Sequence, residues 1–94
     1  MTRIRWTDEA LDDLRAIHHF IEPDSPHYAA LIVEEILAAV ERLESFPLAG
    51  RKVPECPRAD LRELVKRPYR FVYRLVEDGV HIVTVFRSSR LFPG

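Results

Sequence analysis

Hydrophobic and polar residues follow a strand pattern and then a helical pattern at the start of the chain. Between residues 2 and 6, Ile4 and Trp6 fall on one side of an extended backbone and two arginines fall on the other, which is typical of a half-buried strand. Thr7 is a favourable N-cap, and acidic residues follow it where the helix dipole favours them. The pattern predicts a first helix to about Glu22, with a stripe of Leu11, Leu14, His18 and either Ile17 or Ile21.

A second and longer helix is predicted after a proline break. Pro23 ends the first helix, and Ser25 and Pro26 begin the next, because serine caps helices and proline is tolerated at the first helical position. Pro47 closes this helix. Its apolar positions form a wide stripe of Ala29, Ile32, Val33, Ile36, Leu37, Val40, Leu43 and Phe46. The short link between the two helices predicts an antiparallel helical hairpin.

The second half of the chain predicts a loop followed by three strands. Residues 47–59 hold three prolines, and we expect a loop there. Residues 61–66 have a strand pattern, Arg67-Pro68 is a turn or a strand edge, and residues 69–87 are two β-rich runs joined by Asp78-Gly79. The predicted fold class is α+β, with an N-terminal strand, a helical hairpin and a three-stranded antiparallel meander in one small sheet. One domain accounts for residues 1–94.

The Asp-Gly pair sets a register for the predicted hairpin. If Asp78-Gly79 is a two-residue loop, counting outward places Arg70 opposite Arg87. Like charges that face each other across a ladder destabilise a sheet by a few tenths to about 1 kcal/mol. We therefore expect an anionic partner from outside the hairpin to compensate these arginines.

Side-chain alternation divides the predicted hairpin into two faces. The face expected to pack on the helices carries Phe71, Tyr73, Leu75, Ile82, Thr84 and Phe86. The other face carries Arg70, Val72, Arg74, Val76, His81, Val83, Val85 and Arg87. Because this second face is too apolar for an idle surface and too charged for a closed core, we interpret it as a binding face. The alternative is that long arginine stems cover the valines while their charged heads reach water.

Composition narrows the class of protein. A chain of 94 residues with 47% hydrophobic residues fits one folded domain with a modest core. Its net charge is −1, so attraction to an anion must come from a local cluster. The single cysteine, Cys56, excludes an internal disulfide and fits a reducing cytoplasm. The sequence has no signal-peptide core and no run of about 18 apolar residues, so we expect a cytoplasmic protein that binds no membrane.

Other site chemistries have little support in the sequence. His18 and His19 are adjacent and point in different directions from a helix, so we expect no metal site. Cys56 lies in the predicted loop as an inert thiol, and no residue has the surroundings of a catalytic nucleophile. The dipole and solvation explain the carboxylates in the first helix, and core packing explains Trp6. We expect no cofactor.

Several short segments, in a fixed order along the chain, carry a resemblance to a known protein family. The pieces are Trp6, Ala10, Asp13-Leu14, Ile17, Ile36, Leu43, Pro47, Gly50-Arg51, Leu61-Arg62-Glu63-Leu64, Tyr69-Arg70, Val72-Tyr73-Arg74 and Val85-Phe86-Arg87-Ser88-Ser89-Arg90. With them the chain resembles the ParE/RelE superfamily of bacterial toxin-antitoxin toxins over nearly its full length. The resemblance implies a helical hairpin packed against a small antiparallel sheet.

The resemblance also implies one of two activities. RelE-like members are ribosome-dependent messenger-RNA endonucleases, whereas ParE-like members poison DNA gyrase. Arg70 and Arg90 match two arginines that the RelE-like nucleases use on phosphate. Leu61 and Glu63 stand where those nucleases have lysines, Arg87 stands where many members have a histidine, and the chain ends before their carboxy-terminal tyrosine. These differences favour the ParE-like branch.

We therefore expect a ParE-like toxin that poisons DNA gyrase by binding and acts in plasmid stabilisation. The first alternative is a RelE-like nuclease acting on messenger RNA at the ribosome, with candidate catalytic residues Arg70, Arg87, Arg90 and Tyr73. The second is a non-toxic relative that binds only its antitoxin or nucleic acid. All three imply a complex with an antitoxin, whose amphipathic and acidic segment is expected to contact Arg70, Val72, Arg74, Val83, Val85, Arg87 and Arg90.

Overall fold

The computed structural model describes residues 2–93, which form two α-helices and a five-stranded sheet. Its elements in chain order are β1 (Arg3–Trp6), α1 (Asp8–Ile21), α2 (Pro26–Glu41), the 3₁₀ turn η1 (Arg42–Glu44), β2 (Arg51–Lys52), β3 (Leu61–Lys66), β4 (Tyr69–Val76) and β5 (Gly79–Arg87). The strand order is β1-β5-β4-β3-β2, and only the β1–β5 pair among these strands is parallel.

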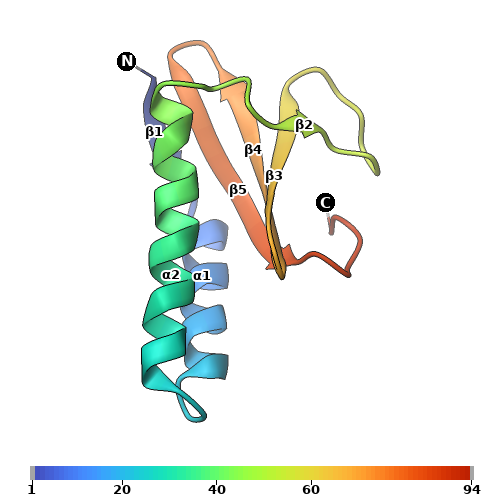
Figure 1. Ribbon diagram of the computed structural model, residues 1–94. Coiled ribbons are helices and arrows are strands. Elements are labelled where there is room, and N and C mark those ends of the chain that lie inside the picture. Colours follow the sequence, from blue (N-terminus) through green and yellow to red (C-terminus); the bar gives the residue numbers. More distant parts are fainter. Residues whose placement is uncertain (1, 94) are drawn as a thin grey trace.

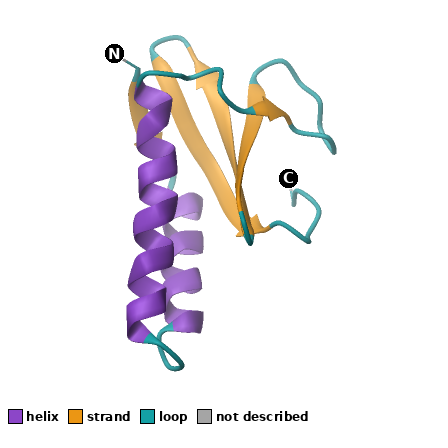
Figure 2. Ribbon diagram, in the orientation of Figure 1, coloured by secondary structure: helices purple, strands orange, loops and turns teal. Residues whose placement is uncertain are grey.

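Two layers are visible in the ribbon views. The two helices lie to the left of β3, β4 and β5, with α2 in front of α1, and the loop after β2 and the C-terminal segment lie to the right of these strands (Figures 1 and 2). The predicted α+β class, the helical hairpin and the three-stranded meander are confirmed. Within residues 2–93, no helix is long and apolar enough to cross a membrane.

The predicted caps fix where the helices begin. The Thr7 hydroxyl accepts a hydrogen bond from the Ala10 N–H at 3.2 Å and donates one to the Ile82 carbonyl at 2.8 Å. One side chain therefore caps α1 and ties it to β5. At the start of α2, the Ser25 hydroxyl accepts a hydrogen bond from the Tyr28 N–H at 3.1 Å. Both caps satisfy N–H groups that the helix itself cannot.

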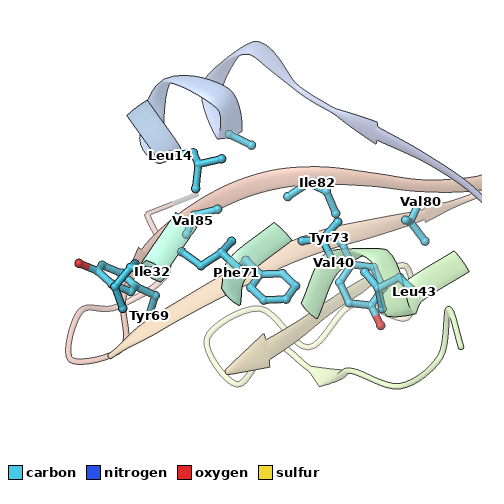
Figure 3. Packing of buried hydrophobic residues seen from close by; sticks show 12 residues of the cluster. Leu14, Ile32, Val40, Leu43, Tyr69, Phe71, Tyr73, Val80, Ile82 and Val85 are labelled. Carbon is cyan, nitrogen blue, oxygen red and sulfur yellow. The ribbon is translucent and has the colours of Figure 1, made fainter. Parts of the chain in front are cut away.

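The main core lies between the helices and one face of the sheet (Figure 3). Its buried members are Ala10, Leu14, Ile32, Ile36, Val40, Leu43, Tyr69, Phe71, Tyr73, Val80, Ile82 and Val85. Burying a large apolar side chain completely stabilises the fold by roughly 1.5–3 kcal/mol. A smaller second core covers the other face and consists of Val53, Leu61 and Val72 with Cys56, Val83, Phe86 and Phe92.

The strand β2 lies inside the predicted loop of residues 47–59, and that part of the prediction is wrong. The buried Tyr73 hydroxyl holds this segment, because it accepts a hydrogen bond from the Gly50 N–H at 2.9 Å and donates one to the Pro47 carbonyl at 2.8 Å. A Cβ at Gly50 would lie 2.6 Å from the Glu63 carbonyl oxygen and 2.7 Å from the Tyr73 hydroxyl. Glycine therefore lets the chain pass closely enough to pair with β3.

The β4–β5 hairpin forms, but its predicted register is wrong. Val76 pairs with Gly79, so the loop consists of residues 77–78. Gly79 does not have the positive φ of a turn glycine and pairs with Arg3 of β1. A Cβ at this position would collide with the Arg3 carbonyl. Gly79 is therefore a strand residue that allows β1 to approach β5.

A β-bulge in β5 changes which side chains share a face. Tyr73 pairs with Ile82 and Val72 pairs with Thr84, so Val83 has no partner on β4. Since side chains alternate along a strand, one extra residue turns the rest of β5 over relative to β4. The two faces predicted from simple alternation are therefore correct only on the turn side of the bulge.

Beyond the bulge, Arg70 lies opposite Phe86 and Arg87 lies opposite Tyr69. The predicted opposition of Arg70 and Arg87 is wrong. Val85 is 3% exposed in the main core, whereas Phe86 packs on the second core. Both outcomes reverse the predicted faces, because the alternation on which the prediction depended is interrupted at Val83.

We expect Tyr73→Phe to lower the free energy of unfolding by about 1–3 kcal/mol. The physical reason is that the Gly50 N–H and the Pro47 carbonyl both lose their partner. Urea unfolding followed by circular dichroism measures this change. Tyr28→Phe is the matched control, since Tyr28 is 44% exposed, and should stay within about 0.5 kcal/mol of the original protein. Equal stability of the two variants would contradict the role assigned to the Tyr73 hydroxyl.

Candidate functional site

Arg70 on β4 lies at the centre of a buried ionic network. Its side chain is 8% exposed, and each of its five N–H groups has an acceptor. Nε and Nη2 donate to one oxygen of Glu63 at 3.1 and 2.5 Å, and Nη1 and Nη2 donate to the two oxygens of Glu55 at 2.9 and 2.8 Å. Nη1 also donates to the Arg90 carbonyl at 2.8 Å. The groups that compensate Arg70 are therefore the chain's own.

The two carboxylates reach Arg70 from different segments. Glu63 on β3 lies opposite Val72 on β4, which makes it a diagonal neighbour of Arg70 on the same face of the sheet. The Glu63 side chain is 0% exposed and also forms an ion pair with Arg51 of β2 at 2.7 Å. Glu55 belongs to the loop between β2 and β3. The network thus joins the middle of the sheet to its edge.

These contacts shift the pKa values of the groups involved. The Arg70 guanidinium lowers the pKa of Glu55 from its usual 4.5 to about 2, and a hydrogen bond from the Phe92 N–H adds to this effect. The Glu55 carboxylate in turn raises the pKa of Arg70. Burial raises the pKa of the Tyr73 hydroxyl, because it disfavours the phenolate. Arg70 and Glu55 are therefore a charged pair at neutral pH, and Tyr73 is a neutral phenol.

The C-terminal segment is held by the same network. The Phe92 N–H donates to Glu55 at 2.8 Å, close to the contact between Arg70 and the Arg90 carbonyl. The Arg70 guanidinium carbon lies 4.8 Å from the centroid of the Phe86 ring. The Phe86 and Phe92 ring centroids are 6.3 Å apart. The segment therefore covers the second core and closes over Arg70.

The structure does not bring the predicted site residues together on one face. Some are buried and offer no surface to a partner: Arg70, Val72, Tyr73 and Val85. Val83 is half-buried against the second core. The exposed ones are Arg74, Arg87 and Arg90. Arg74 is separate from the other two and lies 3.9 Å from the carboxylate of Asp60.

Arg87 and Arg90 line a groove between α1, the end of β5 and the C-terminal segment, which we call the basic groove. Its cavity has a volume of about 470 Å³. Phe20 and Leu91, which are 78% and 77% exposed, line the same groove. The Arg87 guanidinium carbon lies 5.9 Å from the centroid of the Tyr69 ring. The groove thus offers exposed positive charge beside exposed apolar surface.

One carboxylate in the basic groove is already satisfied within the protein. Asp13 accepts hydrogen bonds from the Thr84 hydroxyl at 2.5 Å and from the Val85 N–H at 3.0 Å. These bonds lie on β5 beyond Ile82, where its pairing with β1 ends. Asp13 therefore acts as a cap for a strand edge, and Arg87 and Arg90 dominate the charge of the groove.

Sequence reasoning missed several residues of these sites. Glu55 gave no signal, because it lies in a loop whose path depends on tertiary contacts. Glu63 was identified only as a residue that stands where RelE-like nucleases have a lysine, and its direct contact with Arg70 was not anticipated. Phe20 did carry a signal, since it is a large apolar residue outside the buried stripe of α1. In the part of the chain that the structure describes, no three metal-ligating side chains are grouped to hold an ion.

The sequence of the chain is similar to those of known bacterial toxins. The family model described as the ParE toxin of the type II toxin-antitoxin system parDE matches residues 4–92. The chain is 41% identical over 93 residues to the putative toxin Y4kP of Sinorhizobium fredii, covering 97% of this chain and 93% of that protein. It is 37% identical over 92 residues to the toxin RelE2 of Caulobacter vibrioides, covering 97% of this chain and all of that protein (100%).

Solved structures of toxin-antitoxin systems have the same fold. A chain of the chromosomal ParDE system from P. aeruginosa aligns with a TM-score of 0.76 at 27% identity, covering 93% of this chain and 96% of that chain. A chain of the RelBE2 complex from Mycobacterium tuberculosis aligns with a TM-score of 0.62 at 23% identity, covering 95% and 93% of the two chains. At 23% identity, the comparison with the RelBE2 chain shows only that the two chains share a fold.

We expect the stability of the protein to fall as the pH is lowered from about 4.5 toward about 2, in part through Glu55. The pKa of Glu55 is lower in the folded protein than in the unfolded chain, so the unfolded chain binds more protons in this range. The stabilisation by Glu55 is complete above about pH 4.5 and is lost as the pH falls through about 2.

Urea unfolding of the original protein and of Glu55→Gln, from neutral pH downward, measures this contribution. The stability difference between the two proteins should shrink in acid. Glu41→Gln is the control, because Glu41 is an exposed glutamate at the end of α2. A difference that stays constant over the whole range would contradict the lowered pKa of Glu55.

Proposed function

The chain belongs to the ParE/RelE superfamily of toxins from type II toxin-antitoxin systems and matches its ParE family, and we propose that it arrests bacterial growth by binding and poisoning DNA gyrase. A cognate antitoxin neutralises it in the cytoplasm. In this proposal the toxin acts as a binding protein and uses neither a metal nor a cofactor.

The internal neutralisation of Arg70 is the observation that carries this proposal. A nuclease needs cationic groups free to bind the scissile phosphate. All the N–H groups of Arg70 are instead taken by Glu63, Glu55 and the Arg90 carbonyl. Any phosphate that approached Arg70 would meet two carboxylates. This arrangement supports a binding poison over an RNA-cleaving enzyme.

The other candidate catalytic residues support the same conclusion. The Tyr73 hydroxyl is buried and already bonds Gly50 and Pro47, so it is not available to a substrate. Arg87 and Arg90 are exposed, but arginine side chains do not act as general acids or bases at neutral pH. A general acid or base of matched pKa typically contributes about 10²- to 10⁴-fold to a rate. These arginines are better suited to holding an anionic partner.

A RelE-like endonuclease is the second candidate, because the chain is 37% identical to the toxin RelE2. We expect the purified toxin to inhibit DNA supercoiling by gyrase or to trap cleaved DNA on the enzyme. Ribosomes programmed with messenger RNA should leave the message intact in its presence. Cleavage of the message that Arg90→Ala abolishes, with no effect on gyrase at a large molar excess, would overturn the proposal.

We further propose that the basic groove contacts the antitoxin, and we expect Arg87→Glu to weaken the toxin–antitoxin complex about tenfold or more. Reversing this charge places a carboxylate where an acidic segment would bind. Arg15→Glu is the control, since Arg15 is exposed on α1 and pairs with Asp12 at the surface. Affinities measured by calorimetry decide the matter, and comparable losses for both variants would count against this groove.

A further inference from the structure

The C-terminal segment of residues 88–93 lies outside the helices and strands and still forms one wall of the basic groove. Arg90, Leu91 and Pro93 line the groove from this segment. Phe92, which follows Leu91, packs on the second core instead. An irregular segment therefore supplies a charged side chain and a large apolar side chain to the proposed partner surface.

Two groups from elsewhere in the chain hold the main chain of this segment. Nη1 of Arg70 donates to the Arg90 carbonyl at 2.8 Å, and the Phe92 N–H donates to Oε2 of Glu55 at 2.8 Å. The same Nη1 also donates to the same Oε2 at 2.9 Å, so the four groups form one connected unit. We call this unit the C-terminal clamp. It joins the loop after β2 to the C-terminal segment, which both lie to the right of β4 in Figure 1.

The C-terminal clamp acts on the basic groove from outside it. Among the described residues that line the groove, neither Arg70 nor Glu55 is found, and their side chains are only 8% and 22% exposed. The clamp holds the main chain at Arg90 and at Phe92, the two neighbours of Leu91. Fixing the main chain on both sides of a residue also fixes the direction of its side chain. The shape of the groove therefore depends on groups that a partner in the groove would not touch.

Polar anchors matter here because the segment buries little apolar surface. Leu91 is 77% exposed, Arg90 and Pro93 are exposed as well, and Phe92 is half-buried. A segment with few buried apolar contacts opens at a low free-energy cost unless hydrogen bonds hold it. A partner that binds an open segment must order it first, and that ordering weakens the affinity. A segment that is already held is therefore the better docking surface.

We propose that Glu55 is a positioning residue for the basic groove, because the C-terminal clamp holds Arg90 and Leu91 where a partner contacts them. Glu55 itself does not touch the partner. The inference rests on the proposed antitoxin contact at the basic groove, and it assigns part of the affinity of that groove to a residue in the loop between β2 and β3.

Hydrogen exchange in the free toxin tests the C-terminal clamp without any partner. Glu55→Gln keeps the size of the side chain but removes its charge and one acceptor oxygen. We expect the Phe92 amide to exchange about tenfold faster or more in this variant, because its acceptor is weakened. Glu41→Gln is the matched control, since it makes the same change at an exposed site and should leave this exchange unaltered. Equal exchange of the Phe92 amide in both variants would refute the clamp.

Antitoxin affinity tests the consequence, with the purified antitoxin encoded beside the toxin gene as the probe. We expect Glu55→Gln to weaken binding about fivefold or more, because the partner must then order the segment. Ile36→Val is the control for general destabilisation, since Ile36 is 0% exposed in the main core and its truncation weakens the fold elsewhere. Its affinity should stay within about twofold of the original. Equal losses for the two variants would assign the effect to stability and rule out positioning.

A double-mutant cycle with Arg90→Ala separates positioning from a direct contact of Glu55 with the partner. If Glu55 acts through the side chains that it positions, Glu55→Gln costs less affinity in the Arg90→Ala background than in the original toxin. Additive losses, or an Arg90→Ala variant that binds as tightly as the original, would overturn the inference. Failure of the original toxin to bind the antitoxin would contradict the proposed function itself, whereas normal binding with either of these results overturns only the positioning role.

Discussion

The second face of the sheet depends on the buried charge of Arg70. Removing a guanidinium from water costs several kcal/mol unless its N–H groups find acceptors, and this chain supplies one for each of them. The acceptors belong to three segments, because Glu63 lies on β3, Glu55 in the loop after β2 and Arg90 in the C-terminal segment. One side chain therefore orders two irregular segments that contribute few buried apolar residues of their own.

The helix side of the molecule was largely predictable, because local chemistry decides it. Thr7 and Ser25 cap their helices through contacts three residues away, and most residues of the predicted apolar stripes pack in the core. Leu37 and Phe46 of the second stripe are instead 40% and 64% exposed. The register of the hairpin was not predictable in this way. The Asp78-Gly79 pair is typical of a turn, but Gly79 pairs with Arg3 of β1 and is a strand residue. Competition between a local turn signal and a distant strand cannot be seen in one stretch of sequence.

The site was less predictable than the fold, since it depends on which arginines are buried. Alternation alone placed Arg70 and Arg87 on one exposed face, and the bulge at Val83 separates them. Glu63 stands where RelE-like nucleases have a lysine, and this difference weakened the nuclease interpretation. The same glutamate is a partner of Arg70 in the structure. The sequence showed that the charge was reversed, but pairing across β3 and β4 was needed to show which cation it neutralises.

Burial therefore decides which charges can act on another molecule. Arg70 is neutralised inside the protein, so its positive charge is screened from a phosphate backbone by carboxylates already in contact with it. Arg87 and Arg90 remain in water beside exposed apolar side chains, where charge steers association and apolar contact prolongs it. Catalysis at these arginines would also need a neighbouring group that exchanges protons near neutral pH. The basic groove thus has the parts of a docking surface, which favours a toxin that holds its target over one that cleaves it.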